Sequence, residues 1–362
     1  MTRHQPHHIA PSRQTVRVAH AYKNFQAHKG VSHIGLGVAA LNTSRTLNSH
    51  GIHSEVWPTA TPADIERQLA AAQDAAARRG EHPVSHVVIS APWVPTADLQ
   101  GLLTRWPSVQ FAVVSHSNVG FLMADPNGIK FFREGMDLAI GHHNFALAGN
   151  CAKFCHAWGA MYGRPVAHLP NLYDVSTMKP VGQRVPWHPG SPLRIGVFGA
   201  TRPLKNLPSA VAACVELANE LRADVEVWRN TGRTEGGGSV PDAIQQLTAG
   251  LRHCRVVDAG WASWPQFRST VGRMNLLLSP SYTESFNMVT ADGAAEGVAS
   301  VVSDAIDWAP RDWVAKADDV DDIARVARRL IHDTHAVNEG QRALARYVAH
   351  GIDVWTTFLR TH

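Results

Sequence analysis

The feature that most constrains this chain is an alternation of short apolar segments with longer segments of helical periodicity along its 362 residues. In the first half, the apolar segments at 15–22, 53–58, 85–93, 110–117, 145–149 and 166–171 have the length and composition of β-strands. The segments between them repeat apolar side chains every three or four residues, as amphipathic helices do. Strands that alternate with helices predict a parallel sheet covered by helices, so we expect a doubly wound α/β domain here.

The second half of the chain repeats this alternation, with predicted strands at 193–200, 224–230, 254–260, 274–281 and 299–304. Between the halves, residues 176–192 contain four prolines and two glycines without periodicity, which is typical of a linker. A chain of this length is also too long for one ordinary core. We therefore predict an α/β protein with two Rossmann-like doubly wound domains, at 15–175 and 193–345, that face a central cleft. Residues 1–14 are predicted to be a tail, and 346–362 a C-terminal helix that can pack back on the N-terminal domain.

Composition narrows the class of protein. Hydrophobic residues make up 44% of the chain and charged residues 18%, which is typical of a soluble globular enzyme. No apolar run approaches the roughly 20 residues that span a bilayer, and the first dozen residues lack the apolar stretch of a secretory signal, so we expect a cytoplasmic protein. The net charge of +4 suits an anionic partner such as a nucleotide diphosphate, a nucleic acid or a membrane surface.

The four cysteines are too few and too scattered for a disulfide framework, and we expect reduced thiols. Cys151, Cys155 and His156 come close to metal-ligand spacing, but no second cluster completes a site. The sequence therefore predicts no metal.

The segment 279–304 contains the strongest functional pattern. A predicted strand ends at Pro280, a polar loop with Glu284 follows, a helix starts near Asn287, and Gly297 ends it before the next strand. Ligands of open α/β sheets bind outside the carboxyl ends of the strands, and the exposed N–H groups of a helix start favour an anionic diphosphate. Glu284 and Asp292 are eight residues apart, so both carboxylates could point into one cleft if the helix extends that far.

The stretch from Glu284 to Asp292, with its preceding P-S-x-x-E-S-F, resembles the E-x7-E signature of the family-four glycosyltransferases. The resemblance implies a GT-B fold and transfer of a hexose from a nucleotide-diphosphate sugar such as UDP-glucose, with retention of configuration and no required cofactor. It further implies that Glu284 contacts the donor sugar and that Asp292 holds the ribose, although the family has Glu rather than Asp at the second position. The intervening Ser285, Phe286 and Asn287 are the other donor-binding candidates of this loop.

A second loop supports the first. The predicted strand at 193–200 runs into a segment with Gly199, Arg202 and Lys205, which resembles the family segment whose Arg and Lys bind the donor diphosphate. Departure of a diphosphate leaves negative charge on the leaving group, and two nearby cations stabilise that charge without a metal. The alternative is a basic loop in solvent.

Other similarities are weaker. His116 follows a predicted strand and resembles the family's histidine near the reacting carbon, and Gly260 and Trp261 follow another strand, where the family holds the donor base. The segment 168–174 resembles the one that closes the family's N-terminal domain, with Leu172 and Tyr173 in place of Gly and an apolar residue.

Three glycines, Gly30, Gly35 and Gly37, occupy the first strand-to-helix connection, where the family has a Gly-rich loop near the donor and acceptor. We take Gly35 as the donor-binding candidate among them. Their spacing does not match G-x-G-x-x-G, so the sequence does not support a dinucleotide fingerprint.

The acceptor is the least determined part. Lys130, Arg133 and His143, interleaved with Phe131 and Phe132, could hold a nucleic acid through phosphate contacts and base stacking. The alternative is an amphipathic helix whose phenylalanines are core. The motif loops are also similar to those of tailed-phage and environmental viral glycosyltransferases, which makes 5-hydroxymethylcytosine in DNA, flipped out of the duplex, one candidate acceptor.

Several alternatives stay open at this stage. The acceptor could instead be a glycan or a small molecule, whereas a lipid is disfavoured because no basic amphipathic helix with a clean apolar face stands out in the first half. A nucleotide-sugar epimerase or a non-catalytic sugar-nucleotide binder could also share the layout, although the combination of Arg202, Lys205 and Glu284 argues against both.

Overall fold

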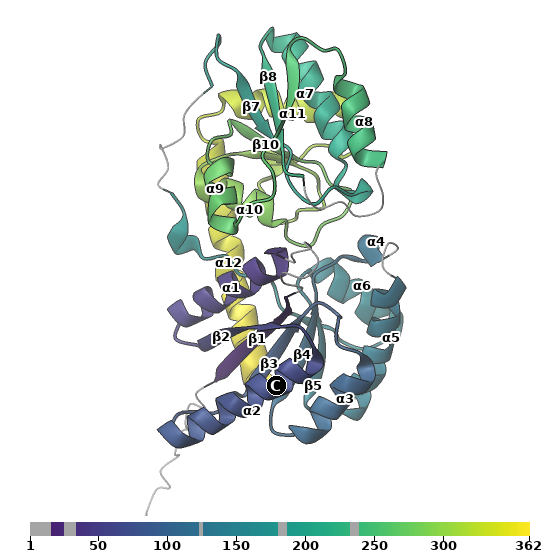
Figure 1. The fold of residues 1–362 in the computed structure, drawn as a ribbon, viewed down its shortest axis with the longest axis vertical. Coiled ribbons are helices and arrows are strands. Elements are labelled where there is room, and N and C mark those ends of the chain that lie inside the picture. Colours follow the sequence, from purple (N-terminus) through teal and green to yellow (C-terminus); the bar gives the residue numbers. More distant parts are fainter. Residues whose placement is uncertain (1–15, 25–33, 123–125, 180–186, 232–238) are drawn as a thin grey trace, which may run out of the picture.

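The computed structural model describes residues 16–24, 34–122, 126–179, 187–231 and 239–362. It has two α/β domains stacked along the long axis of the molecule, the N-terminal domain below and the C-terminal domain above in Figure 1. The predicted tail and the central part of the predicted linker lie outside the described residues. Among the described helices, none is long and apolar enough to cross a membrane.

The N-terminal domain is built on a parallel sheet in the order β2-β1-β3-β4-β5-β6. Its strands are β1 (Arg17–Lys23), β2 (His53–Thr59), β3 (His86–Ser90), β4 (Gln110–Ser115), β5 (Phe145–Gly149) and β6 (Ala167–His168). Its helices are α1 (Ile34–Ser49), α2 (Pro62–Arg79), α3 (Thr96–Arg105), α4 (Val119–Leu122), α5 (Pro126–Gly141) and α6 (Ala152–Tyr162).

Both faces of this sheet are buried, which explains why its strands are apolar without alternation. On β4, Phe111 and Val113 belong to one core cluster, whereas Ala112 and Val114 belong to another on the opposite face. Successive side chains of a strand point to opposite faces, so a strand covered on both sides must be apolar throughout. The six strands occur where the sequence predicted them.

The C-terminal domain has a parallel sheet in the order β11-β10-β7-β8-β9. Its strands are β7 (Leu193–Gly196), β8 (Val225–Arg229), β9 (Cys254–Asp258), β10 (Leu276–Ser279) and β11 (Ser300–Val302). Its helices are α7 (Leu207–Leu221), α8 (Ser239–Thr248), α9 (Trp264–Val271), α10 (Met288–Glu296), α11 (Val320–His332) and α12 (Ala336–Thr361), with short 3₁₀ turns η2 (Pro203–Lys205) and η3 (Arg311–Trp313).

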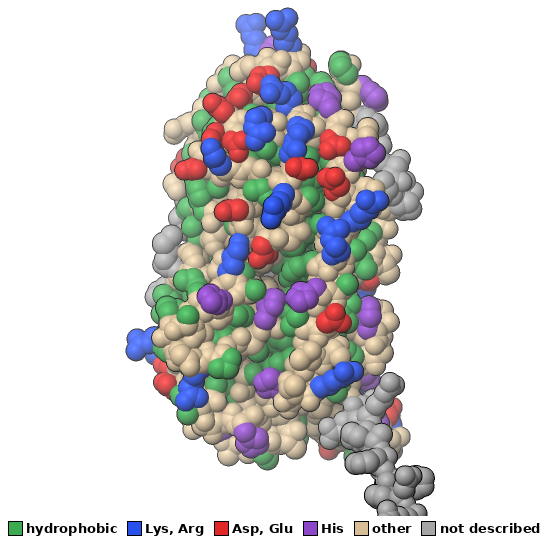
Figure 2. All heavy atoms as spheres, turned by 180° about the vertical axis from the view of Figure 1, so that it is seen from behind, with side chains coloured by type: hydrophobic (Ala, Val, Ile, Leu, Met, Phe, Trp, Pro, Cys, Tyr) green, Lys and Arg blue, Asp and Glu red, His purple; other side chains and the backbone are tan. Residues whose placement is uncertain are grey.

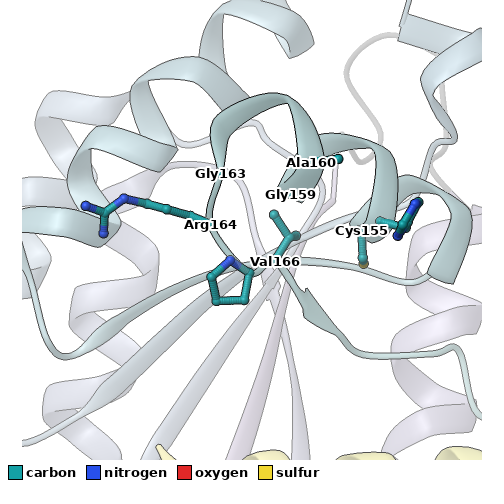
Figure 3. A pocket seen from close by; sticks show the side chains of 8 residues that line it. Cys155, Gly159, Ala160, Gly163, Arg164 and Val166 are labelled. Carbon is teal, nitrogen blue, oxygen red and sulfur yellow. The ribbon is translucent and has the colours of Figure 1, made fainter.

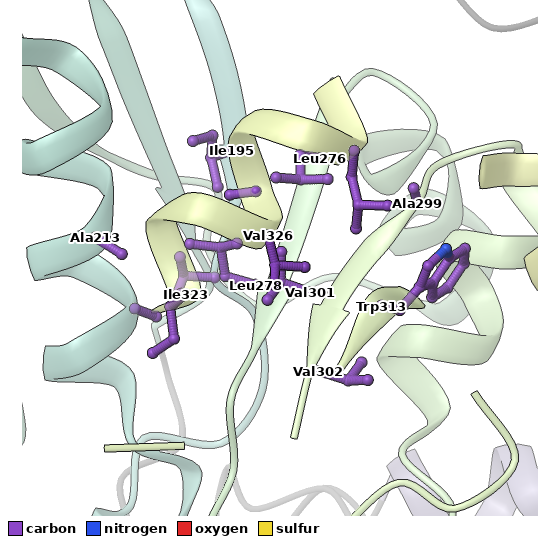
Figure 4. Close-up of a cluster of buried hydrophobic side chains, with 14 of the residues drawn as sticks. Ile195, Ala213, Leu276, Leu278, Ala299, Val301, Val302, Trp313, Ile323 and Val326 are labelled. Atoms are coloured by element: carbon purple, nitrogen blue, oxygen red, sulfur yellow. The ribbon is translucent and has the colours of Figure 1, made fainter. Parts of the chain in front are cut away.

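The core of the C-terminal domain forms where α7 and α11 pack on one face of its sheet. Figure 4 shows Ile323 and Val326 of α11 beside Leu278 of β10, all fully buried. The acidic segment before α11 acts as a cap, since the Asp319 side chain accepts a hydrogen bond of 3.0 Å from the Asp322 backbone N–H. Such a cap satisfies one of the unpaired N–H groups at the start of a helix.

The last helix, α12, joins the two domains. It begins beside the C-terminal domain and continues downward behind the N-terminal sheet (Figure 1), so the predicted boundary between residues 345 and 346 falls inside one continuous helix. Trp355, Phe358 and Leu359 pack in the same core cluster as Val18. Trp355 Nε1 also donates a hydrogen bond of 2.8 Å to the carbonyl of Pro170, which precedes the interdomain connection.

We expect Trp355→Ala to lower the free energy of unfolding by about 3–5 kcal/mol, because it removes a buried aromatic side chain and leaves the Pro170 carbonyl without its donor. Chemical denaturation followed by circular dichroism measures this change. Arg360→Ala, at an exposed position of the same helix, serves as the control. A loss below about 1 kcal/mol for Trp355→Ala would show that α12 does not stabilise the N-terminal sheet.

Candidate active site

The topology of the C-terminal sheet brings two predicted loops together. The chain runs from β7 to β8 on one side and later returns to β10 on the other side, so β7 and β10 pair at the point where the strand order reverses. Ligands of doubly wound sheets bind outside the carboxyl ends of strands at such a point. Lys205 follows β7 and Glu284 follows β10, and the two side chains meet between these loops.

Lys205 and Glu284 form a buried ion pair across the two loops. The side chains are only 12% and 7% exposed, and Lys205 Nζ donates to Glu284 Oε1. The same carboxylate oxygen accepts hydrogen bonds from Ser281 Oγ at 2.9 Å and Asn287 Nδ2 at 3.2 Å. A buried charge is stable only when it is paired and hydrogen-bonded, so these partners fix the carboxylate in place.

The helix that carries Asp292 does not include Glu284. Asn287 caps α10 with a left-handed backbone (φ 61°), and its side chain accepts a hydrogen bond of 3.0 Å from the Thr290 N–H. Glu284 therefore lies in the loop before the cap, whereas Asp292 lies in the second turn of α10. The predicted helix start near Asn287 agrees with the structure, and the condition that the helix extend back to Glu284 is not met, because the capping conformation of Asn287 begins the helix there.

Gly199 shapes the β7 loop around Lys205. Its φ of +128° is rarely adopted by other residues, and a Cβ added there would lie 3.7 Å from Lys205 Cε. Its N–H donates to Asn230 Oδ1 at 2.8 Å, which ties this loop to the end of β8.

Arg202 reaches the other domain. Its guanidinium lies over the ring of Phe121 in α4, 4.6 Å from the ring centroid. The neighbouring Gly120 also lies close to the β10–α10 loop, since a Cβ there would be 3.3 Å from Thr283 Oγ1. The short helix α4 therefore packs directly beside the two loops that carry Arg202 and Glu284.

His116 and Ser285 meet at the same interface. Ser285 Oγ donates to the His116 carbonyl at 3.0 Å, and Asn150, directly after β5, donates to Ser285 Oγ at 3.3 Å. Burial lowers the pKa of His116 to about 4, so its imidazole is neutral at physiological pH. A neutral imidazole can donate from one nitrogen and accept at the other, which suits recognition of a hydroxyl group.

A cavity of about 120 Å³ lies between α1 of the N-terminal domain and α9 and α10 of the C-terminal domain. Four predicted donor residues, Gly35, Gly199, Trp261 and Asp292, line it together. Its wall is largely apolar and aromatic, with Trp264 and Phe267 from α9 and Met288 from α10. The complete lining is Gly35, Val38, Gly199, Asn230, Trp261, Ala262, Trp264, Phe267, Met288, Val289 and Asp292. An apolar wall with a few polar groups is typical of a small-molecule site.

Asp292 is the acidic group of this cavity and is 1% exposed. Its Oδ1 accepts hydrogen bonds from Tyr173 Oη at 2.8 Å and from Trp264 Nε1 at 3.0 Å. Burial raises its pKa from 3.8 to about 7 despite these hydrogen bonds. The carboxyl group therefore changes its charge within the physiological pH range.

Two of the predicted donor residues lie elsewhere than expected. The Phe286 side chain is 1% exposed and packs against Trp308 and Tyr347 in the core, so only its backbone can face a ligand. Gly35 lies in the first turn of α1 rather than in a loop, as does Gly37, where the Tyr22 ring packs closely against the helix. Gly30 lies outside the described residues. Gly260 follows β9 as predicted, with φ +66° and its N–H bonded to Asp258 Oδ1 at 2.9 Å.

The predicted acceptor residues do not form an aromatic platform. Phe131 and Phe132 are 6% and 0% exposed, because the hydrophobic side of α5 packs on the sheet. The amphipathic-helix alternative is the correct one for these rings. Lys130 and Arg133 are exposed on α5, and His143 is exposed in the turn after it.

Sequence reasoning missed Asn150, Asn230, Tyr173 and Trp264. Both asparagines follow a strand directly, and the rule that ligand sites form at carboxyl strand ends could have found them. Tyr173 and Trp264 gave no comparable signal, because an isolated aromatic residue is usually core.

A second hollow, of about 440 Å³, opens beside α6 and β6, and Figure 3 shows Cys155, Arg164 and Val166 among the side chains that line it. None of the predicted site residues lines it. All four cysteines are buried free thiols, and no group of three or more His, Cys, Asp or Glu in the described part of the chain could hold a metal ion.

Neither a protein-family model nor a curated protein sequence matches this chain. Solved structures do. A UDP-forming α,α-trehalose-phosphate synthase from Burkholderia vietnamiensis is 9% identical, with a TM-score of 0.64 over 96% of this chain and 97% of its own. Sucrose-phosphate synthase from Thermosynechococcus elongatus is 12% identical, with a TM-score of 0.63 over 95% of this chain and 99% of its own. These similarities confirm the predicted GT-B fold with its two Rossmann-like domains.

The pKa of Asp292 generates a prediction for stability. Because this pKa is raised above its ordinary value of 3.8 to about 7, the folded state binds more protons than the unfolded state between these values. The free energy of unfolding should therefore fall as pH rises from 4 towards 7, by an amount on the order of a few kcal/mol. Asp292→Asn should remove this component.

Urea denaturation of wild type and Asp292→Asn from pH 4.5 to 8 tests this expectation. Asp353→Asn, which changes an exposed carboxylate on α12, should follow the wild-type profile. Parallel profiles for wild type and Asp292→Asn would contradict the raised pKa.

Proposed function

We propose that this protein is a retaining glycosyltransferase that moves a hexose from a UDP-sugar to an acceptor hydroxyl. The observation that carries the proposal is that Gly199 and Asp292 line one cavity between the two domains, while Gly199 lies against Lys205, which pairs with Glu284. The trehalose-phosphate synthase that shares the fold is UDP-forming, and the other similar structure is also named as a synthase of a sugar phosphate. These names support sugar transfer as the chemistry of the cleft.

In this proposal, Lys205 and Arg202 stabilise the leaving diphosphate. Both follow β7 at the switch point, where the carboxyl ends of the strands face the cleft. As the bond from the anomeric carbon to the phosphate oxygen breaks, negative charge grows on the diphosphate, and nearby cations lower the barrier. The acceptor hydroxyl attacks the same face of the sugar and passes its proton to the departing phosphate oxygen, so no protein nucleophile is required.

Glu284 and His116 are the proposed contacts of the transferred sugar. A carboxylate accepts hydrogen bonds from sugar hydroxyls, and a neutral imidazole can donate to or accept from one. Ser285 links the two residues, because it follows Glu284 in the chain and hydrogen-bonds the His116 carbonyl. Asn287 Nδ2 donates to Glu284 Oε1, the oxygen that also accepts from Lys205.

Asp292, Trp261 and Gly260 are the proposed nucleotide contacts. Asp292 would accept from the ribose hydroxyls, and the exposed backbone after β9 would hold the base. The aromatic wall of the cavity favours a flat ring, since an offset stack on an indole buries the facing surfaces of the two rings.

We propose a small hydroxylated acceptor, such as a sugar or sugar phosphate, over DNA. Base stacking on Phe131 or Phe132 is excluded by their burial, and the cations of α5 are balanced by Glu134 and Asp137 on the same helix. Figure 2, seen from behind, shows Lys and Arg side chains interspersed with acidic ones over the C-terminal domain in its upper half, whereas nucleic-acid sites gather cations on one surface. Hydroxymethylated DNA remains the second candidate because Lys130, Arg133 and His143 are exposed.

We expect Lys205→Ala to lower turnover on the order of 100-fold, because the leaving diphosphate loses a cation in a partly buried site. Lys316→Ala, which removes an exposed lysine from the same domain, should leave turnover unchanged. Steady-state kinetics gives the ratio, and circular dichroism shows whether the fold persists. If Lys205→Ala turns over at the wild-type rate, Lys205 does not stabilise the leaving diphosphate.

A panel of nucleotide sugars, tested with sugar, sugar-phosphate, plain DNA and hydroxymethylcytosine DNA acceptors, measures the activity itself. Mass spectrometry should find one added hexose on a small acceptor, and proton NMR should show that the new bond keeps the anomeric configuration of the donor.

Each other result has a distinct meaning. A hexose on the modified base alone would establish the DNA acceptor instead. Conversion of the donor into an isomeric nucleotide sugar would identify an epimerase, and binding without turnover would identify a sugar-nucleotide binder.

A further inference from the structure

The connection between the domains contacts the acidic group of the proposed donor cavity through Tyr173. This residue lies between β6 and the 3₁₀ turn η1 (Val175–Thr177), is fully buried, and donates its phenolic hydrogen to Asp292 Oδ1 at 2.8 Å. The two residues are 119 positions apart in the chain. The acidic group of the cavity is thus held by a side chain that comes from the segment leaving the N-terminal domain.

The hydrogen bonds that Asp292 accepts end on one of its two carboxylate oxygens. Within the described part of the chain, both of its hydrogen bonds, from Tyr173 and from Trp264 Nε1, end on Oδ1. Asp292 also lines the cavity. Two donors on one oxygen fix the rotation of the carboxylate, which leaves Oδ2 for a ligand.

The rest of the connection is fastened to the same two helices. Arg268 of α9 donates to Thr177 Oγ1 and to the Thr177 carbonyl, both at 3.0 Å. Lys179 pairs with Glu296 of α10 at 2.5 Å, and Glu296 also pairs with Arg268 at 2.7 Å. Residues 173 to 179 therefore contact both α9 and α10, and Tyr173 is the residue of this segment that hydrogen-bonds a side chain lining the cavity.

We propose that Tyr173 is a positioning residue of the donor site, whose phenol holds one oxygen of Asp292 and directs the other towards the ribose of the nucleotide sugar. This inference rests on the proposed function of the cavity. It assigns no contact between Tyr173 and the substrate, because the phenol acts through the carboxylate.

The charges around Asp292 determine how its titration responds to Tyr173. Burial raises its pKa, whereas the hydrogen bonds from Tyr173 and Trp264 and the charge of Arg268 lower it, and Glu296 raises it. Glu296 opposes the effect of Arg268, with which it forms an ion pair. Loss of the Tyr173 hydroxyl therefore raises the pKa of Asp292 further, and the carboxylate form that accepts from ribose hydroxyls becomes scarcer at neutral pH.

Calorimetric binding of UDP-glucose from pH 5.5 to 8.5 tests this role, because the diphosphate diester of this donor does not titrate in that range. Wild type should lose affinity as pH falls through about 7, the value to which the pKa of Asp292 is raised. Tyr173→Phe should bind about 3- to 10-fold more weakly at pH 7, with the midpoint of its pH profile moved to higher pH. Tyr347→Phe is the matched control, since it removes the hydroxyl of another tyrosine that packs in the core against Phe286 and Trp308.

A double-mutant cycle separates positioning from general damage. If Tyr173 acts only through the carboxylate, adding Tyr173→Phe to Asp292→Ala should change the affinity no further. The affinity of Asp292→Ala, with or without Tyr173→Phe, should not depend on pH in this range. Asp292→Asn replaces Asp292→Ala in the cycle if the alanine variant does not fold. Weaker binding by Tyr173→Phe with an unmoved midpoint, or an equal loss in both backgrounds, would overturn the proposal.

The two hypotheses can fail separately. If wild type does not bind UDP-glucose, the proposed donor is wrong. The effect of the Tyr173–Asp292 hydrogen bond is then measured from the pH dependence of unfolding alone. In that measurement the fall in stability with rising pH should extend to higher pH in Tyr173→Phe than in wild type. Identical unfolding profiles would overturn the role of Tyr173 without reference to any donor.

Discussion

The buried ion pair between Lys205 and Glu284 is the interaction on which the arrangement of the cleft depends. The two side chains are 79 positions apart, and they meet because β7 and β10 are neighbours at the reversal of the strand order. Removal of one partner would leave an unpaired charge in a nearly closed site, which costs several kcal/mol. The pair therefore fixes the β7 and β10 loops relative to each other, and with them Gly199, Asn287 and the start of α10.

The two domains are joined by more than the chain connection. α12 carries Trp355 onto the N-terminal sheet. The Ser285–His116 and Arg202–Phe121 contacts join loops of the C-terminal domain to the N-terminal domain. Residues 173 to 179 tie the same interface to α9 and α10. Because each of these contacts includes a residue of the cleft or an element beside it, a change in the relative placement of the domains would also change the shape of the cavity.

Much of the fold was predictable because strands buried on both faces are apolar throughout, and because apolar side chains recur every three or four residues along an amphipathic helix. The loops after β7 and β10 were predictable for a related reason, since polar residues directly after an apolar strand lie at the carboxyl edge of the sheet. The prediction failed where tertiary packing decided the direction of a side chain. The helix begins after Asn287, as the sequence predicted, but Phe286 packs into the core although it was a donor-binding candidate.

The sequence by itself determined the two parallel sheets, the fold that they imply, and the cationic and acidic loops at the carboxyl ends of β7 and β10, because these depend on periodicity and local order. Only the tertiary structure decided which distant side chains share the cavity. Tyr173 meets Asp292, and Asn150 meets Ser285, across 119 and 135 positions. Such contacts depend on the packing of helices and on the placement of the two domains, and a side chain gives no sign in the sequence of the partner it will meet. The same packing raises the pKa of Asp292, since burial is a property of the folded chain.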